Sequence, residues 1–410
     1  MSLVFKILRR YGLQLLTVAI ILYVLLFHVE YDELYRAFIN VSWTFVFLAI
    51  IANLTSIMLK VASWKIIFDF TFDGIKGRWR DLTSALMIGF LVNLIVPARL
   101  GELARAFVIS RREALLGTPV SRSTVFGTIV LERVFDGVAM AMIVIYGVVH
   151  MDLPDWADKG AIVLLVISGF FAIAMVVLEI KRERITETAE QAEASLEEHH
   201  PWWRRWSIRF YGVVARFSEG QKVLRSPGRV VLICMTTATS WLAQLTAVFF
   251  SLHAFHLGYI GFLGALLLLI LINVAGALPA TPGNVGVFQL ATVIPLTVTY
   301  GIPKTTALAF SVGLQIIEGS IGLVGGSGCL LQEGLKFDQV RSGAREFEEE
   351  VEQQAEEELE DHRMLEEKVG DIGHEVDDIG LEVKDLRHKV EDSMAEDNED
   401  DENRSIGSTD

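Results

Sequence analysis

Long apolar stretches divide the chain into segments whose lengths suit helices that cross a membrane. A helix needs about 20 apolar residues to span the hydrocarbon core of a bilayer, and most of the segments reach that length. Segments 82–98 and 285–300 are short for a full crossing. The apolar segments lie at about residues 11–29, 43–68, 82–98, 123–150, 161–180, 230–256, 260–279, 285–300 and 305–332. The pattern predicts an all-α polytopic integral membrane protein.

Proline and glycine interrupt the apolar pattern at two places. The first is NLIVPARLGELAR, residues 93–105, and the second is GALPATPGNVGVFQ, residues 276–289. Both contain P-A-x-x-G followed by Glu or Asn, which alone is a weak repeat signal. Each break also follows an asparagine and precedes a long segment with an acidic residue: Asn93 and Glu132 in the first half, Asn273 and Glu318 in the second. Paired interruptions in the two halves of a chain point to an inverted repeat with a binding site at the breaks.

Basic residues decide how the short segments lie in the membrane. Arginines and lysines occur both before segment 82–98 and after its continuation, so a full crossing would put one basic cluster outside, against the positive-inside tendency. A re-entrant hairpin at 82–112 keeps both clusters in the cytoplasm, and a second hairpin from residue 260 enters from the other side. We predict these two re-entrant helical hairpins, in an inverted repeat, and six full spans that start near residues 11, 43, 123, 161, 230 and 305. Both termini are then cytoplasmic, in a multi-pass protein of the cell membrane.

Composition agrees with this class and locates the charge. The 410 residues are 52% hydrophobic, which excludes an ordinary soluble domain. The net charge is −15, but residues 342–410 hold 27 acidic and 7 basic side chains, a net −20, so the rest of the chain carries +5. Cys234 and Cys329 lie far apart in apolar segments and support neither a disulfide framework nor a metal site. We expect no cofactor and no nucleic-acid partner.

Polar stretches define the domain organisation. Residues 1–335 form the membrane domain, and residues 181–228 within it are a cytoplasmic or interfacial helical excursion. A basic, tryptophan-bearing helix in this excursion either lies in the inner interface, against anionic lipid, or packs on the cytoplasmic face of the protein itself.

The C-terminal tail has a different composition from the membrane domain. Residues 336–392 are acidic, and apolar residues from Val369 to Val390 alternate by three and four, which predicts a short coiled coil that joins protomers into a homo-oligomer. Residues 393–410 are predicted to be a disordered acidic terminus. Truncation after Gln332 is therefore expected to leave a folded membrane protein.

Charged residues inside segment 123–150 need either water or partners. Glu132 and Asp136 share one face of a helix, and Arg133 is three residues from Asp136 and can pair with it. The break at PARLGE is the natural partner, unless the span simply ends at Pro97 and its charges meet water. These charges form either a static ion-pair network or a binding site.

The two breaks also expose backbone groups. A helix that starts near Gly101 presents free N–H groups to an anion, such as Glu102 or a substrate phosphate. Asn284 is predicted to cap the equivalent helix after Gly283.

Three ordered motifs, N-x3-PARLGE-x2-R, ER-x2-D and PGNVGVFQ, closely resemble the membrane region of the lysylphosphatidylglycerol synthase/flippase family. The resemblance covers residues 1 to about 335 and implies an inner-membrane protein that moves lipids between leaflets. The sequence after 335 is too short and too polar for the aminoacyl-transferase domain of the bifunctional members, so synthesis of an aminoacyl lipid is not expected. The resemblance implies cavity residues at Asn93, Arg99, Glu102, Arg105, Glu132, Arg133, Asp136, Pro282, Gly283, Asn284 and Gln289.

The favoured function is lipid translocation by a protein that is not an enzyme, through a polar cavity between the two hairpins. Arg99 and Arg105 would hold a lipid phosphate, and Glu132 and Asp136 would balance those arginines or bind a cationic headgroup. The candidate residues include three arginines and, with Glu318, four acids, so the sequence does not decide whether the headgroup is an anion or a cation.

Two other classes of function remain. One is a membrane-embedded transferase or hydrolase that acts on a polyprenyl-phosphate lipid or a phospholipid, with Glu132 or Asp136 as the general base. The other is a membrane scaffold that assembles through the tail, which explains the tail but not the buried charges.

Overall fold

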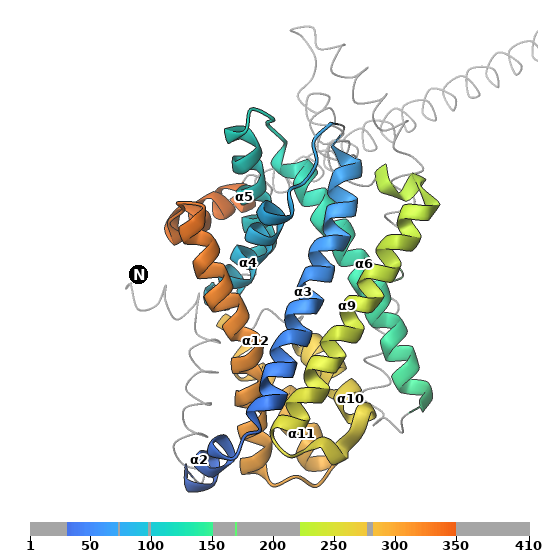
Figure 1. Cartoon of the computed structure of the whole chain (residues 1–410), viewed down its shortest axis with the longest axis vertical. Helices are drawn as coiled ribbons and strands as arrows, with labels where there is room; N and C mark the ends of the chain where they lie inside the picture. The colour runs from blue at the N-terminus through green and yellow to red at the C-terminus, as the bar shows by residue number, and fades with distance from the viewer. Residues whose placement is uncertain are drawn as a thin grey trace, which may run out of the picture. The chain divides into compact units, whose positions relative to one another are not determined.

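The computed structural model describes residues 31–72, 74–96, 100–150, 169, 222–276 and 282–349. These residues contain helices and turns without strands (Figure 1), which confirms the all-α prediction for this part of the chain. The α-helices are α2 (Tyr31–Ile39), α3 (Trp43–Thr71), α4 (Trp79–Ile95), α5 (Gly101–Leu115), α6 (Arg122–His150), α9 (Pro227–Ala254), α10 (Gly261–Gly276), α11 (Val287–Val298) and α12 (Lys304–Gln332). Short 3-10 turns are η1 (Lys222–Arg225), η2 (Gly258–Ile260) and η3 (Pro282–Asn284), and residues 337–349 are also helical.

Four of the described helices are long and apolar enough to cross a membrane: α3, α9, Gly258–Gly276 and α12. A helix of 29 residues, as in α3 and α12, is roughly 43 Å long at the standard rise, which exceeds the hydrocarbon thickness. Gly258–Gly276 is long enough to cross, although the sequence predicts that it forms half of a hairpin, and the hairpin stays a prediction. The predicted spans 11–29 and 161–180, most of the excursion 181–228, the coiled coil and the acidic terminus lie outside the described residues, apart from Gly169 and residues 222–228.

Helices α3 and α9, one from each half of the chain, make the most extensive helix–helix contact in the described part (Figure 1). Small hydroxyl residues line the contact and are buried. The hydroxyl oxygens of Ser56 and Ser240 lie 3.1 Å apart, as do those of Ser63 and Thr237, and Ser240 also donates to the backbone oxygen of Ser56 at 3.0 Å. Small polar residues let helix backbones approach closely in a membrane. The pair therefore joins the two halves.

Helices α4 and α5 pack against each other on either side of the first break. The backbone N–H of Gly101, the first residue of α5, donates to Oδ1 of Asn93 at 2.8 Å. A Cβ atom on Gly89 would lie 2.8 Å from Cγ of Arg105 and 2.9 Å from the backbone oxygen of Gly101, so only glycine allows this approach. The helix start predicted near Gly101 is confirmed.

The second break differs from the prediction. Helix α11 begins at Val287, and Gly286, not Asn284, is its N-cap residue, with its N–H donated to Oε1 of Gln289 at 2.6 Å. Asn284 has a φ of 57° and Gly283 a φ of 60°, so both lie in the left-handed region. The left-handed turn at these two residues delays the helix start beyond Asn284.

The packed unit continues past the domain boundary predicted at 335. Leu335, Val340, Ala344 and Phe347 are buried in the same core as α4, α5 and α6. The ring of Phe347 meets that of Phe126 edge to face at 5.8 Å. The sequence interpretation assigned this region to the tail because of its acidic residues, but the apolar positions 340, 344 and 347 have helical spacing. The membrane unit therefore extends at least to Glu349.

Candidate functional site

A cavity of about 620 Å³ lies between helices of both halves of the chain. Helices α3, α4, α5 and α6 line it from the first half, and α9, α10, η3, α11 and α12 from the second. Its ionisable lining residues are Lys60, Glu102, Arg133, Asp136 and Glu318. Two cations and three acids thus line this cavity.

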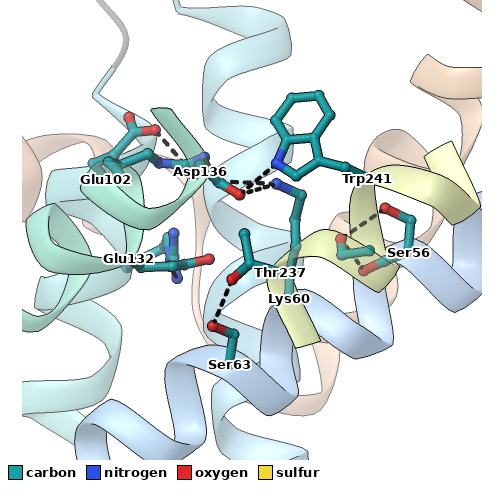
Figure 2. Close-up of polar contacts among 11 residues, drawn as sticks. Ser56, Lys60, Ser63, Glu102, Glu132, Asp136, Thr237 and Trp241 are labelled. Atoms are coloured by element: carbon teal, nitrogen blue, oxygen red, sulfur yellow. Dashed lines mark hydrogen bonds and ion pairs between the residues drawn. The ribbon is translucent and has the colours of Figure 1, made fainter. Parts of the chain in front are cut away.

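Asp136 is the most heavily bonded residue of this cavity (Figure 2). Lys60 donates to its Oδ1 at 3.0 Å and to its Oδ2 at 2.9 Å. The indole N–H of Trp241 donates to Oδ1 at 3.1 Å, and Arg133 donates to Oδ2 at 3.1 Å. Four charge-assisted or indole hydrogen bonds thus end on one carboxylate. Asp136 therefore links α3, α6 and α9.

Arg133 connects α6 to the first break. In addition to Asp136, it meets Glu102 of α5, with Nη2 3.4 Å from Oε1. The Arg133 side chain is 38% exposed and that of Glu102 is 28% exposed. This ion pair is therefore more exposed than the contact between Lys60 and Asp136. Both contacts were expected from the sequence: the pairing of Arg133 with Asp136, and the use of the PARLGE break as a partner.

Arg105 and Glu132 form a second ion pair that lies away from the cavity wall. Nη2 of Arg105 is 2.6 Å from Oε2 of Glu132, and the two side chains are 2% and 3% exposed. The guanidinium lies 4.1 Å from the ring centroid of Trp64, whose indole N–H donates to Thr128 at 3.0 Å. Neither residue lines the cavity, contrary to the prediction that Arg105 holds a lipid phosphate there. The stem of Arg105 instead fills the space beside Gly89, which turns the guanidinium into the protein.

In the second half, Glu318 lies on the cavity and accepts a hydrogen bond from Gln244 at 3.3 Å. Within the described ranges, no lysine, arginine or histidine lies within ion-pair distance of Glu318. Gln289 does not line the cavity but donates to Gln315 at 2.6 Å, and Gln315 donates to the backbone oxygen of Gly283 at 2.9 Å. Gln289 and Gln315 thus hold the turn that brings Gly283 to the cavity.

The sequence comparisons agree with the membrane architecture. Residues 13–326 match the family described as Lysylphosphatidylglycerol synthase TM region. The chain belongs to this family. It is therefore a multi-pass membrane protein, as its long apolar helices indicate.

A curated protein named as a glycosyltransferase is also similar to the chain. Glycosyltransferase AglD of Haloferax volcanii is 24% identical over 282 residues, which are 63% of this chain and 44% of that protein. The similarity thus spans less than half the length of this relative. No solved structure matches the chain.

The structure brings together most of the site residues predicted from the sequence, which are those implied by the family motifs and Glu318. Asn93, Glu102, Arg133, Asp136, Gly283, Asn284 and Glu318 line one cavity, while Arg105 and Glu132 lie behind it and Gln289 supports the second turn. Pro282 belongs to η3, but its side chain is outside the described part of the structure, and Arg99 lies wholly outside it.

Sequence reasoning missed several cavity residues. Lys60 could have been found from the sequence, because a cation in the middle of a long apolar helix needs a partner of opposite charge. Little in the sequence indicated the other cavity residues, because single polar or aromatic residues in apolar helices also occur at ordinary helix contacts. These residues are Asn53, Trp241, Gln244 and Gln315. In the described residues, no group of three or more His, Cys, Asp or Glu side chains is arranged to hold a metal ion.

Proposed function

We propose that the protein moves a membrane lipid between leaflets by passing its headgroup through the cavity. The observation that carries this proposal is a cavity of about 620 Å³ that carries charged and amide side chains on its wall, is lined by both halves of a membrane protein and is bordered by both helix breaks. A polar headgroup cannot cross hydrocarbon unaided without losing its hydrogen bonds to water. Charged and amide side chains along the cavity would replace those hydrogen bonds.

The two interrupted helix pairs supply a means of alternating access. In this proposal, α4 with α5 and α10 with α11 are re-entrant hairpins that enter from opposite sides, as in transporters built on inverted repeats. The ion pair of Arg133 and Glu102 joins α5 to the long helix α6 and is partly exposed. A shift of α5 that lengthens this contact would open the cavity next to the first break. Arg99, at the same break, is the proposed contact for the lipid phosphate.

A membrane transferase is the second candidate, because the relative from Haloferax volcanii is named a glycosyltransferase. The geometry of the site supports a transferase less well than it supports lipid movement. Asp136 accepts hydrogen bonds from Lys60, Arg133 and Trp241, so both of its carboxylate oxygens are already engaged by protein donors. Glu132 is buried against Arg105 and does not reach the cavity. Neither acid suggested from the sequence is therefore free to act as a general base.

Reconstitution separates the two functions. The purified protein would be placed in liposomes that contain acyl-chain-labelled lipids in both leaflets, and a membrane-impermeant reductant would bleach the outer label. Translocation makes the inner-leaflet label accessible as well, whereas protein-free liposomes keep it protected. Mass spectrometry of the same lipids reports chemical change. Movement without chemical change supports the proposal, conversion without movement supports the transferase, and the absence of movement for every lipid tested overturns the proposal.

A further inference from the structure

Carboxamide side chains are unusually frequent on the cavity wall. Six line it, and they come from helices of both halves: Asn53, Asn93, Gln244, Asn273, Asn284 and Gln315. Of the six, only Gln244 bonds to an ionisable residue of the described wall, Glu318, and the charged residues Lys60 and Arg133 contact Asp136 and Glu102 instead.

Several of these amides have hydrogen-bonding groups to spare. Among the described residues, neither Asn53 nor Asn284 has a side-chain hydrogen-bond partner, although both line the cavity. Asn93 uses only its oxygen, which accepts from the N–H of Gly101, so its NH₂ group remains available. Asn273 uses only its NH₂ group, which donates to the backbone oxygen of Leu269, so its oxygen remains available. Gln244 likewise donates to Glu318 and keeps its oxygen.

The spare groups include both donors and acceptors, and this mixture indicates the chemistry of a ligand. A phosphate offers only acceptors and an ammonium group only donors, whereas each hydroxyl both donates and accepts. A wall of amides therefore complements a group with many hydroxyls better than it complements either ion. Lys60 and Arg133, the cations on the described wall, are both engaged with carboxylates.

We propose that the headgroup portion held by this wall is a glycosyl group, an uncharged polyhydroxyl ring, so that the lipid moved is a glycolipid. The proposal rests on the function proposed above and narrows its substrate class. The cavity volume of about 620 Å³ lies within the range of ordinary small-molecule sites and accommodates a sugar while the lipid tails stay outside. A diacylglycerol glycolipid and a polyprenyl phosphosugar share this headgroup chemistry.

The test compares lipids that differ only in their headgroups. Liposomes with the full-length protein would contain acyl-labelled monoglucosyl diacylglycerol or phosphatidylethanolamine with the same tails, and the bleaching rate would be measured for each. We expect the glucosyl lipid to move about tenfold faster, since a few hydrogen bonds contribute at least this factor. Equal rates, or faster movement of phosphatidylethanolamine, overturn the glycosyl inference and leave lipid translocation standing. If no lipid moves, translocation itself fails and the inference fails with it.

A polyprenyl phosphoglucose probe, with the label on its chain, distinguishes the two sources of the headgroup. If the polyprenyl phosphoglucose moves faster than the glucosyl diacylglycerol, the substrate is a polyprenyl phosphosugar. If the glucosyl diacylglycerol moves faster, the substrate is a diacylglycerol glycolipid. Either order supports the inference, provided that the glucosyl form moves faster than the same carrier without its sugar.

Substitution of one amide tests the wall directly. Asn53→Leu removes a donor and an acceptor that have no partner in the described part of the protein, so the ratio of the glucosyl rate to the phosphatidylethanolamine rate should fall about tenfold. Asn40→Leu is the matched control, because Asn40 is exposed and does not line the cavity, and it should leave the ratio unchanged. Asn284→Asp is the second variant if Asn53→Leu does not fold. A variant that slows both lipids equally overturns the assignment.

Discussion

Lys60 of α3 donates hydrogen bonds to both carboxylate oxygens of Asp136 of α6, at distances of 3.0 and 2.9 Å. The side chains are 16% and 10% exposed, so the pair lies largely away from water. A lysine within a membrane-spanning helix destabilises the protein unless it is paired with an opposite charge. The contact thus gives each charge the partner that it needs and fixes α3 against α6.

Removal of Lys60 should destabilise the protein. In Lys60→Met, Asp136 keeps Arg133 and Trp241 but loses its closest cation, and we expect the free energy of unfolding to fall by about 3 kcal/mol. Thermal unfolding of the purified protein in detergent would measure the loss. The double variant Lys60→Met with Asp136→Asn should recover part of it, since no uncompensated charge remains. A double variant less stable than the single one would contradict this interpretation.

Arg105 and Glu132 should be structural. Arg105→Met leaves a buried carboxylate without its partner and should cost about 3 to 5 kcal/mol, whereas an apolar pair, Arg105→Met with Glu132→Leu, should match or exceed the stability of the unsubstituted protein. Two nitrogens of Arg105 and one oxygen of Glu132 have no hydrogen-bond partner in the described structure, which favours the apolar replacement. Retained lipid movement in the double variant would place both residues outside the transport path. Loss of movement in a stable double variant would restore Arg105 to the binding site.

Arg99 carries the opposite prediction. If it holds a lipid phosphate, Arg99→Ala should abolish lipid movement and leave the melting temperature nearly unchanged. Arg99→Lys should be stable but poorly active, because lysine keeps the charge but loses the planar fork that binds phosphate in bidentate fashion. Full activity in the lysine variant would show that charge alone suffices. An unstable alanine variant, rescued by neutralisation of Glu102 at the same break, would make Arg99 a structural partner instead.

The hairpin topology predicts that both flanks of α4 and α5 face the cytoplasm. Lys76→Cys and Leu116→Cys are suitable sites, because both residues are exposed, whereas a side chain on Gly77 would lie 2.8 Å from Leu82. In a background without Cys234 and Cys329, both cysteines should react only with reagents added from the cytoplasmic side. Reaction of Leu116→Cys from outside would replace the hairpin by a full crossing.

The residues after α12 should contribute to stability. Truncation after Gln332 removes Val340 and Phe347, which are buried, and each large apolar side chain contributes about 1.5 to 3 kcal/mol. We expect a clear fall in melting temperature for this truncation and little change for truncation after Glu349. Equal melting temperatures for both truncated proteins would show that the 337–349 helix does not stabilise the membrane domain.

Local patterns in the sequence were sufficient for most of the described helices and for contacts within one helix. The pairing of Arg133 with Asp136 follows from a spacing of three residues, and the start of α5 follows from Gly101. The partner of Asp136 on α3 lies 76 residues away and depends on tertiary packing. The burial of Arg105 depends on space beside Gly89, a property of α4 that no pattern in α5 contains.

Four hydroxyl side chains, Ser56, Ser63, Thr237 and Ser240, connect α3 and α9 out of reach of solvent. In a bilayer, no water is available to replace a hydroxyl contact that breaks, so pulling these helices apart would leave polar atoms in an apolar medium. We therefore expect the pair to behave as a fixed axis in the proposed transport cycle, with the surrounding helices rotating about it. A covalent crosslink between α3 and α9 at this seam should leave the cycle running, whereas a crosslink from α5 to α6 should stop it.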